Sequence, residues 1–226
     1  MSTDVRHPHA LGLGMTSERS RHRLIERLRG IGAGDERVLQ AMARVPRHQF
    51  VDEAMASRSY DDTALPIGYG QTISQPFVVA HMTTLLLGEG EPPATVLEIG
   101  TGSGYQAAVL AELVRTVYTV ERIPALYRRA RTRLLEIGYR NVRVRLADGT
   151  IGLPDYGPFD AILVTAGAET LPEALLEQLR EGGRLVAPVG GREGQRLVVI
   201  DRHADGLDRQ ELDPVSFVPL LPGVEE

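Results

Sequence analysis

The amino-acid sequence predicts an α/β fold built on a doubly wound, mostly parallel sheet. From residue 95 onward, short apolar runs alternate with amphipathic stretches, a pattern typical of buried strands separated by helices. A glycine-rich turn follows the first apolar run, and an acidic residue stands at or near the end of each of the first three runs. We therefore expect one main domain that binds a ligand at the carboxyl ends of its strands, as sheets of this kind do.

The apolar runs and the stretches between them give the expected order of strands and helices. Buried strands are expected at residues 95–100, 116–121, 142–147, 159–165 and 184–190, with helices near 104–114, 124–137 and 171–180. Residues 195–220 contain two further strand patterns joined around Asp205 and Gly206, which predicts an antiparallel hairpin closing one edge of the sheet. The sequence leaves the order of the strands open.

The N-terminal part of the chain has a helical pattern instead. Apolar residues at helical spacing predict a helix over 24–31, a second helix capped by Asp35, and a third over 76–87. We therefore divide the chain into three parts. These are a disordered tail at 1–16, an N-terminal helical region at 17–90 that packs on the core and carries the loop at 72–75, and an α/β core with its C-terminal hairpin at 91–226.

Composition and charge exclude several kinds of chemistry. The 226 residues include no cysteine and no lysine, which rules out thiolate sites, Schiff bases and the lysine of phosphate-binding loops. The net charge of −5 argues against nucleic acid as a partner, and no apolar stretch is long enough to span a membrane. His7 and His9 would need a third ligand to bind a metal, so we expect no metal site. We expect a cytoplasmic monomer.

The strongest single motif is "EIGTGSGY", which follows the first strand. Gly100, Gly102 and Gly104 allow a sharp turn and a close approach of the backbone to a ligand. A dinucleotide-binding loop would have its third glycine where this chain has Tyr105, so the spacing argues against NAD. A nucleoside-type ligand without phosphates fits better, and Glu98 is placed to attract a cation such as an ammonium group. The alternative is a tight strand-to-helix turn whose glycines serve packing alone.

Two further acidic positions lie at strand ends. Glu121 closes the second strand, where it is either a carboxylate that accepts hydrogen bonds from both ribose hydroxyls or a solvated acid. Asp148 and Gly149 follow the third strand, where they either face an adenine ring or form an ordinary Asp-Gly turn. The carboxyl ends of neighbouring parallel strands meet at one edge of the sheet, so three acids there favour a ligand site.

Several longer segments carry a resemblance to a known family. "VLEIGTGSGYQAAVLAELV" and "VYTVERI" resemble class I S-adenosylmethionine-dependent methyltransferases. The resemblance extends to bacterial protein-L-isoaspartate O-methyltransferases through "VPRHQFV", "ALPIGYGQTISQPFVVAHMT", "FDAILVTA", "LLEQLREGGRLVAPVG" and "FVPL". The glycine loop is shared by many kinds of methyltransferase, whereas "QTISQP" together with "VPRHQFV" is specific to this family. The resemblance covers the chain from about Arg19 to Gly223 and implies a Rossmann-like methyltransferase fold.

The resemblance also implies an activity. The family transfers a methyl group from S-adenosylmethionine to the free α-carboxylate of L-isoaspartyl residues, which form by deamidation of asparagine or isomerisation of aspartate. The resulting ester collapses to a succinimide, which reopens partly to normal aspartate, so the reaction starts a repair. The implied partners are isoaspartyl-containing proteins and peptides.

The resemblance assigns site residues position by position. It implies that Ser74 is the catalytic residue, and that Glu98 and the glycine loop hold the methionine part, Glu121 the ribose, and Asp148 with Gly149 the adenine. The implied cofactor contacts are Thr72, Ile73, Ser74, Glu98, Gly100, Thr101, Gly102, Ser103, Gly104, Glu121, Arg122, Asp148 and Gly149. The implied substrate contacts are Ile73, Ser74, Gln75, Val218 and Leu220.

The polar group formed by Thr72, Ser74 and Gln75 suits this chemistry. A carboxylate with a pKa of about 4 is already ionised at neutral pH, so its attack on a sulfonium methyl group needs no general base. The protein has to orient the two reactants, and a hydroxyl donor orients a carboxylate without protonating it. A helix that begins near Pro76 adds its positive N-terminal end. Alternatively, Ser74 or Gln75 only caps that helix.

Other positions have a structural interpretation or depart from the family pattern. We expect His81 to be a packed or surface histidine and His48 to hold the helical region in place. Residues 167–172 ("GAETLP") and Ser216 differ from the residues that are common in the family. These departures affect the wall near the sulfur of the cofactor and the grip on the peptide at the hairpin.

Two other functions stay open at this point. One is the methylation of ordinary aspartates during maturation of a peptide natural product, by an enzyme that usually carries an added C-terminal segment. The other is a non-catalytic cofactor-binding protein, which should have lost Ser74 or the acids at the strand ends. This chain keeps all of them.

Overall fold

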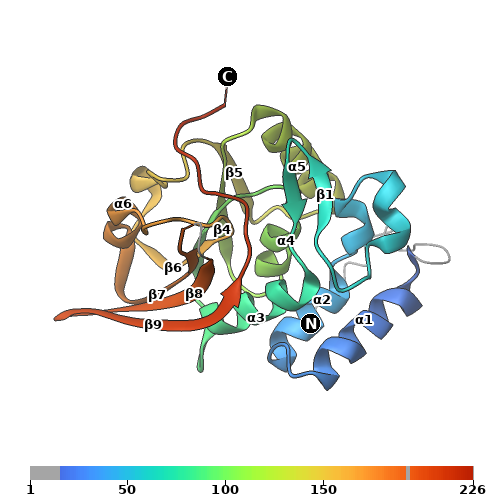
Figure 1. Ribbon diagram of the computed structural model, residues 1–226, viewed down its shortest axis with the longest axis horizontal. Coiled ribbons are helices and arrows are strands. Elements are labelled where there is room, and N and C mark those ends of the chain that lie inside the picture. The colour runs from blue at the N-terminus through green and yellow to red at the C-terminus, as the bar shows by residue number, and fades with distance from the viewer. Residues whose placement is uncertain (1–15, 192–193, 226) are drawn as a thin grey trace.

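A seven-stranded sheet forms the centre of the protein in the computed structural model, which describes residues 16–191 and 194–225 (Figure 1). The strand order is β5-β4-β3-β6-β7-β8-β9, with parallel pairing from β5 to β7 and antiparallel pairing from β7 to β9. The strands are β3 (Thr95–Ile99), β4 (Thr116–Glu121), β5 (Val142–Leu146), β6 (Phe159–Val164), β7 (Leu179–Val189), β8 (Gln195–His203) and β9 (Gly206–Val215). The predicted α/β fold, with its mostly parallel sheet and C-terminal hairpin, is confirmed.

The strand order places a ligand site between β3 and β6. The chain runs outward from β3 to β4 and β5, then returns to place β6 on the other side of β3. The connections leave from the carboxyl ends of β3 and β6 in opposite directions, and this divergence opens a crevice of the kind that binds ligands in open α/β sheets. The strand order, which the sequence left open, therefore places this crevice at the carboxyl end of β3, where the glycine-rich motif lies.

The helices between the strands are shorter than the sequence pattern suggests in two places. They are α4 (Tyr105–Ala111), α5 (Pro124–Ile137) and α6 (Glu173–Glu177). The expected helix at 171–180 begins only after Pro172 and ends early, because the chain from Leu179 already pairs with Phe159 as part of β7. The expected helix at 104–114 ends at Ala111, since its last turn tightens before the chain enters β4.

Three helices precede the sheet, as expected from the apolar spacing. They are α1 (Glu18–Gly30), α2 (Glu36–Arg44) and α3 (Pro76–Leu87), with two short 3-10 turns, η2 (Arg47–Phe50) and η3 (Glu53–Arg58), between α2 and α3. Asp35 caps α2 through a hydrogen bond from the Val38 N–H to its carboxylate, at 2.9 Å. The predicted tail at 1–16, together with His7 and His9, falls almost entirely outside the described residues.

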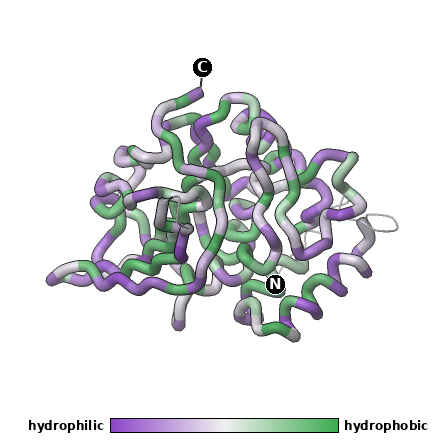
Figure 2. The backbone as a smooth tube through the Cα atoms, viewed as in Figure 1, coloured by the Kyte–Doolittle hydropathy of each residue, from purple (hydrophilic) through white to green (hydrophobic). Residues whose placement is uncertain are grey.

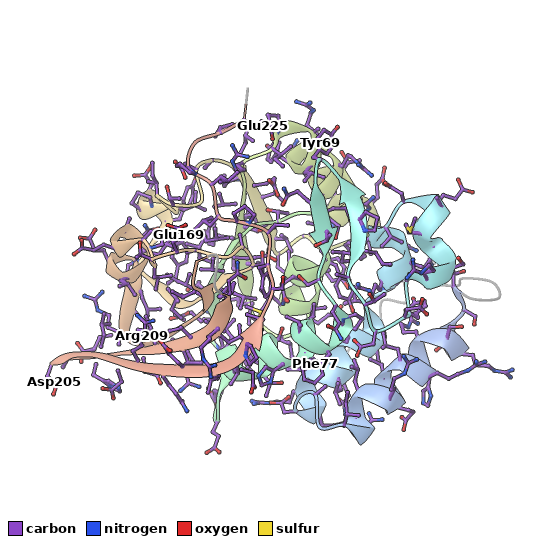
Figure 3. All side chains as sticks on the ribbon, viewed as in Figure 1. Tyr69, Phe77, Glu169, Asp205, Arg209 and Glu225 are labelled. Atoms are coloured by element: carbon purple, nitrogen blue, oxygen red, sulfur yellow. The ribbon has the colours of Figure 1, made fainter. Side chains whose placement is uncertain are left out.

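A small hairpin interrupts the region that was expected to be helical throughout. Strands β1 (Leu65–Gly68) and β2 (Gln71–Ile73) pair through a turn in which Gly68, Tyr69 and Gly70 all have positive φ angles, of 89°, 56° and 67°. Glycine adopts positive φ angles without steric strain, so the two glycines favour this turn. The hairpin is too short to produce a clear alternating pattern of apolar and polar residues in the sequence. Its tip is marked by Tyr69 in Figure 3, and its second strand leads straight into Ser74.

The two faces of the sheet are covered by different parts of the chain. Neighbouring residues of β3 point to opposite faces, so Val96 packs with the apolar residues of the N-terminal helices while Leu97 packs with Phe159 and Leu175. The N-terminal helices therefore share one hydrophobic core with the sheet. Figure 2 shows that β9, by contrast, is mostly hydrophilic along its length. No helix within residues 16–191 and 194–225 has the length and apolar character needed to cross a bilayer.

Candidate active site

A cavity lies at the carboxyl ends of β3, β4 and β6 and encloses about 860 Å³, part of it open to solvent. Three segments form its walls: the glycine-rich loop after β3, strand β2 with the residue that follows it, and the chain that follows β9. The glycine loop contributes Gly100, Thr101, Gly102 and Ser103, and the segment of β2 contributes Thr72 and Ile73 together with Ser74 directly after the strand. The structure thus brings together residues from both halves of the chain, as the sequence motifs predict.

Two glycines of the loop, Gly100 and Gly102, line the cavity. At Gly100 there is no room for a side chain. Gly100 has a φ of 102°, and a Cβ atom on it would lie 2.6 Å from the Thr165 Oγ1 atom. Thr165 in turn donates a hydrogen bond to the Gly100 carbonyl at 2.8 Å, which holds the loop against the end of β6. Thr165 lines the cavity but was not predicted as a site residue. Its place at the carboxyl end of a predicted strand was the signal that could have identified it.

Gly104 has a different role from the other two glycines. It does not line the cavity, and it forms the N-cap of α4 with a φ of 91°. A Cβ atom there would lie 3.1 Å from the Leu134 Cδ1 atom on α5. Gly104 is therefore the glycine that serves packing alone, and its predicted contact with the cofactor has no support in this geometry. Gly100 and Gly102 shape the cavity itself.

The Glu121 carboxylate lies on the cavity wall and holds the glycine loop. It is 6% exposed, and its two oxygens accept hydrogen bonds from the Gly102 N–H at 2.8 Å and the Ile123 N–H at 2.9 Å. Burial raises the pKa of this carboxyl, and the backbone N–H donors partly offset that effect. A carboxylate has about four acceptor positions, so this one retains capacity for two ligand hydroxyls.

Glu98 lies behind the loop and does not line the cavity. Its carboxyl is fully buried, and one oxygen accepts a hydrogen bond from Thr119, whose hydroxyl also lies 2.7 Å from that of Thr101. The other oxygen has no hydrogen-bond partner among the described residues. Burial raises the pKa of Glu98 to about 8, so the group is mostly neutral at pH 7. The structure thus gives no support to Glu98 as a charged contact for an ammonium group.

Asp148 is also turned away from the cavity, although Gly149 lines it. One Asp148 oxygen accepts hydrogen bonds from the Thr150 N–H and hydroxyl at 2.8 and 2.7 Å, and the other accepts from the Gly223 N–H at 2.6 Å. Burial would raise the pKa of Asp148, but these hydrogen bonds lower it below its ordinary value. Arg122 does line the cavity, and it donates to the Gly223 carbonyl at 3.1 Å.

A second hollow, which we call the groove, adjoins the cavity. Four residues line both spaces: Thr72, Ser74, Thr165 and Val218. Gln75 lines only the groove, whereas Ile73 and Leu220 line only the cavity. The five residues predicted to contact the substrate are therefore divided between the two spaces, with Ser74 and Val218 where the spaces meet.

The start of α3 does not use Ser74 or Gln75 as a cap. Gln75 is the N-cap residue but makes no side-chain capping bond, and the Ser74 hydroxyl has no hydrogen-bond partner among the described residues. The Asp62 carboxylate accepts from the Phe77 N–H at 2.8 Å instead. The capping alternative for Ser74 is thus not what the structure shows. The helix end is not freely available to a substrate anion either, because Asp62 already occupies it.

A fully buried arginine fixes the backbone of Ser74. Arg47, which is 0% exposed, donates to the Ser74 carbonyl at 2.8 Å and to the Ser59 carbonyl at 2.9 Å. Its guanidinium group lies 4.7 Å from the centre of the Tyr105 ring, and Tyr105 lines the cavity. No carboxylate among the described residues forms an ion pair with Arg47. Arg47 was not predicted as a site residue, although it belongs to the quoted "VPRHQFV" segment.

The two histidines discussed from the sequence lie near the site without entering the cavity. His48 contacts the Tyr60 hydroxyl at 2.8 Å, beside the segment that holds Arg47. His81 lies on the groove wall, stacked on Phe77, with its Nε2 atom 3.6 Å from an Asp213 carboxylate oxygen. Both positions are consistent with the packing roles that the sequence predicts.

The departure at residues 167–172 has a structural reason at its first position. The Gly167 N–H donates to the Val218 carbonyl, and the Leu220 N–H donates to the Gly167 carbonyl, both at 2.7 Å. A Cβ atom at Gly167 would lie 2.1 Å from the Gln195 side-chain nitrogen and would displace this amide, which donates to the Phe217 carbonyl and accepts from the Phe217 N–H. Ser216 is exposed on the groove wall. Gly167 thus holds Val218 and Leu220, which line the cavity, in place through its backbone.

Comparisons with known proteins agree with this geometry. The family described as protein-L-isoaspartate(D-aspartate) O-methyltransferase (PCMT) matches residues 19–225. The chain belongs to this family. A protein-L-isoaspartate O-methyltransferase of Halorhodospira halophila is 58% identical over 219 residues, which are 97% of this chain and 99% of that protein. One of Xanthomonas euvesicatoria pv. vesicatoria is 60% identical over 218 residues, covering 96% of each chain.

Solved structures of PCMT-family proteins share the fold. A protein-L-isoaspartate O-methyltransferase superposes with a TM-score of 0.81 at 28% identity, covering 90% of this chain and 67% of that one. A putative family member from Plasmodium falciparum, in complex with S-adenosyl-L-homocysteine, superposes with a TM-score of 0.80 at 27% identity. That match covers 89% of this chain and 98% of the Plasmodium chain. The predicted resemblance is thereby confirmed over nearly the whole sequence.

The buried Glu98 should make the stability of the cofactor-free PCMT-family fold depend on pH. The folded protein holds the Glu98 proton up to about pH 8, whereas the ordinary value is 4.5, so the unfolding free energy of the wild type should fall as the pH rises between these values. Glu98→Gln keeps the neutral form and should be more stable than the wild type at pH 8.5 by on the order of 2–4 kcal/mol. Urea unfolding without cofactor at pH 5.5 and 8.5 measures both quantities.

Glu136→Gln, on the exposed side of α5, is the matched control and should unfold with the wild-type pH dependence. In every variant Glu121 contributes to the pH dependence of the unfolding free energy, because burial raises its pKa as well. Equal slopes for Glu98→Gln and the wild type would show that Glu98 is ionised in the folded protein.

Replacement of the buried Arg47 by lysine should damage both the fold and the loop that carries Ser74. Lysine keeps the charge but cannot donate to both carbonyls in the fixed geometry of a guanidinium group. Arg47→Lys should therefore lower the unfolding free energy by about 2–4 kcal/mol, as measured by urea unfolding. Arg23→Lys, at an exposed position of α1, should change it by less than about 0.5 kcal/mol. Wild-type stability of Arg47→Lys would contradict the role given to the two hydrogen bonds.

Proposed function

We propose that Ser74 is the point at which this enzyme transfers a methyl group from S-adenosylmethionine to the free α-carboxylate of an L-isoaspartyl residue. Membership of the PCMT family makes the chain a protein-L-isoaspartate O-methyltransferase, which methylates isoaspartyl residues in protein repair. The observation that carries the proposal is the place of Ser74, where the cavity and the groove meet, with a hydroxyl that no described residue engages. Two reactants in adjoining spaces would meet at this residue.

The cavity residues suit S-adenosylmethionine. Glu121 retains acceptor capacity for ribose hydroxyls, and Gly149 presents its backbone beside Ile99 because a Cβ atom there would lie 2.7 Å from the Ile99 Cγ2 atom. Gly100 and Gly102 leave room for close contact with the rest of the molecule. When bound, S-adenosylmethionine supplies an electrophilic methyl group on a positively charged sulfur. The complex of the Plasmodium relative with S-adenosyl-L-homocysteine supports this choice of cofactor.

The groove suits a peptide that brings its carboxylate to Ser74. Its walls are Phe77, Val78 and His81 of α3 on one side and residues 213–218 on the other. The lining mixes apolar and polar side chains, which suits an extended chain of varied sequence. The isoaspartyl carboxylate is ionised at neutral pH, so no residue of the enzyme has to remove a proton before the methyl group is transferred.

The task left to the protein is to align the carboxylate and the sulfonium methyl and to exclude water. The Ser74 hydroxyl can donate one hydrogen bond that orients the carboxylate without neutralising it. Asp62 at the start of α3 repels a second carboxylate, which keeps the substrate anion away from that helix end. The buried charge of Arg47 lies behind the Ser74 carbonyl and opposes this repulsion.

The product would be a methyl ester that collapses to a succinimide, so the partners are proteins and peptides that contain isoaspartyl residues. Methylation of ordinary aspartates is the competing function, and the two differ only in the shape of the accepted residue. An isoaspartyl residue routes the main chain through its side chain and leaves the free carboxylate one bond from the α-carbon. That the enzyme works as a monomer in the cytoplasm stays a prediction from the sequence.

A pair of peptides that differ only in isoaspartate or aspartate at one position tests the proposed substrate. A pocket shaped for the isoaspartyl branch should methylate that peptide at least about 100-fold faster, since misplacing the carboxylate loses alignment worth several kcal/mol. Transfer of a radiolabelled methyl group from S-adenosylmethionine measures both rates. The wild-type enzyme should also bind S-adenosyl-L-homocysteine by calorimetry. Comparable rates on the two peptides would contradict the proposed repair function and favour methylation of ordinary aspartates.

Removal of the Ser74 hydroxyl tests how the reaction is catalysed. Ser74→Ala should slow methyl transfer by about 10- to 1000-fold, because the substrate loses orientation and one hydrogen bond, while the affinity for S-adenosyl-L-homocysteine should change little. The pH profile should keep its acidic limb near the pKa of the substrate carboxylate, because the enzyme supplies no base. Single-turnover kinetics with the isoaspartyl peptide measures both effects.

Ser216→Ala is the matched control for the Ser74 experiment, since Ser216 lies exposed on the groove wall. It should keep the wild-type rate within about threefold, the size of most surface effects. Full activity of Ser74→Ala would leave this serine without a part in the reaction. An acidic limb near pH 7 would instead indicate a catalytic base such as His81.

A further inference from the structure

We propose that Thr165 is a second residue in contact with the reacting atoms, and that its hydroxyl oxygen faces the sulfonium methyl group of bound S-adenosylmethionine. Ser74 then orients the carboxylate, and Thr165 aligns the methyl group that the carboxylate attacks. The inference rests on the methyl transfer of the proposed function, but its main test needs no peptide. Thr165 was not predicted as a site residue from the sequence.

Thr165 lies where the methyl group has to pass from one reactant to the other. The cofactor occupies the cavity and the peptide occupies the groove, so the transfer takes place where these spaces meet. Four residues line both spaces: Thr72, Ser74, Thr165 and Val218. The attacking oxygen and the methyl carbon approach to roughly 3–3.5 Å before the bond forms, so side chains at this junction are the ones within reach of the methyl group.

Three hydrogen bonds fix Thr165 at the carboxyl end of β6. Its N–H donates to the Ile99 carbonyl at 2.9 Å, and its hydroxyl donates to the carbonyls of Ile99 and Gly100 at 2.9 and 2.8 Å. Both acceptors belong to the end of β3 and the start of the glycine loop. The side chain of Thr165 is therefore held in one orientation before a ligand binds, which is what a preorganised site requires.

The Thr165 hydroxyl is available to a ligand only as an acceptor. It has a single hydrogen, which the two carbonyls share, so only its lone pairs remain. An acceptor oxygen repels a carboxylate and attracts C–H groups that carry partial positive charge, as those of a sulfonium methyl group do. The Ser74 hydroxyl, by contrast, is engaged by no described residue and is free to donate. The junction thus offers a donor to the anion and an acceptor to the cation.

This contact follows the change of charge in the reaction. A carboxylate oxygen forms a bond to the methyl carbon while the carbon–sulfur bond breaks, and the electron pair of that bond stays on sulfur, which becomes neutral. No proton moves in this step. S-adenosyl-L-homocysteine lacks both the methyl group and the positive charge, so the Thr165 oxygen favours S-adenosylmethionine over this product. A residue that only supported the glycine loop would affect the two ligands equally.

The ratio of two dissociation constants tests the contact in the absence of peptide. Calorimetry gives the Kd of S-adenosylmethionine and that of S-adenosyl-L-homocysteine for the wild type, Thr165→Val, Thr165→Ala and Thr165→Ser. We expect the first Kd divided by the second to rise by about threefold to tenfold in the valine and alanine variants, which lack the oxygen. Thr165→Ser keeps the oxygen, so its ratio should stay within about twofold of the wild-type value.

Thr95→Val is the matched control, because it also removes a hydroxyl that bridges β3 and β6. The Thr95 hydroxyl donates to the Asp160 carboxylate at 2.8 Å, at the start of β3 and away from the cavity. This variant should keep the wild-type ratio of dissociation constants. Thermal unfolding without ligand shows whether each variant folds. Thr165→Ala guards against a folding defect of Thr165→Val, in which a methyl group would meet the Gly100 carbonyl in place of the hydroxyl.

Methyl transfer gives a second measurement. At saturating S-adenosylmethionine, Thr165→Val should lower kcat by about 10-fold or more, while the KM of the isoaspartyl peptide should change by less than about threefold. Thr165→Ser should restore most of the wild-type kcat.

Two outcomes would overturn the proposal. Equal losses of affinity for both ligands in Thr165→Val and Thr165→Ala would show that Thr165 only supports the glycine loop. A ratio in Thr165→Ser that matches the valine variant would show that the oxygen is not the atom that matters. Wild-type protein that binds both ligands but does not methylate the isoaspartyl peptide would contradict the proposed function alone, because the ratio of dissociation constants still decides the role of Thr165.

Discussion

The buried guanidinium group of Arg47 is the interaction on which the arrangement of the site depends. Burial of a charge is costly unless hydrogen bonds replace its water. Arg47 donates from Nε and Nη2 to two backbone carbonyls and lies over an aromatic ring, whereas its Nη1 atom has no hydrogen-bond partner among the described residues. One carbonyl belongs to Ser74 and the ring to Tyr105, which begins the helix after the glycine loop. The substrate side and the cofactor side of the site are therefore joined through one side chain from the N-terminal region.

The two buried acids at the ends of β3 and β4 differ in their hydrogen-bond partners and in their access to the cavity. Glu121 accepts two backbone N–H groups, which can only donate, and this environment suits an ionised carboxylate. Glu98 accepts a hydrogen bond from one hydroxyl, and burial together with the neighbouring Glu121 raises its pKa to about 8, so it is mostly protonated at pH 7. Of these two acids, Glu121 is therefore the one that lies on the cavity wall with acceptor positions left for a ligand.

The sequence was sufficient for the sheet, the glycine loop and Glu121, because these follow from local periodicity and from the rule that ligands bind at the carboxyl ends of parallel strands. It was insufficient for Arg47 and Thr165, whose partners are distant in the chain, and for the hairpin around Tyr69, whose strands are too short to show alternation. Glu98 and Asp148 were identified as acids at strand ends, but their orientation depends on Thr119 and Gly223, which no local pattern indicates.

Strand β9 forms one edge of the sheet and lies beside the groove, since Asp213, Pro214 and Val215 belong to both. Extended, partly unfolded chains are the material that a repair enzyme meets, and a free strand edge is a template on which such chains can add themselves. Strand β9 carries the exposed charges of Asp208, Arg209 and Glu211, and its next-to-last residue is Pro214, which has no N–H to donate to another strand. Charge and proline oppose the pairing of a further strand with β9, so this edge is protected against the addition of an eighth strand beside the groove.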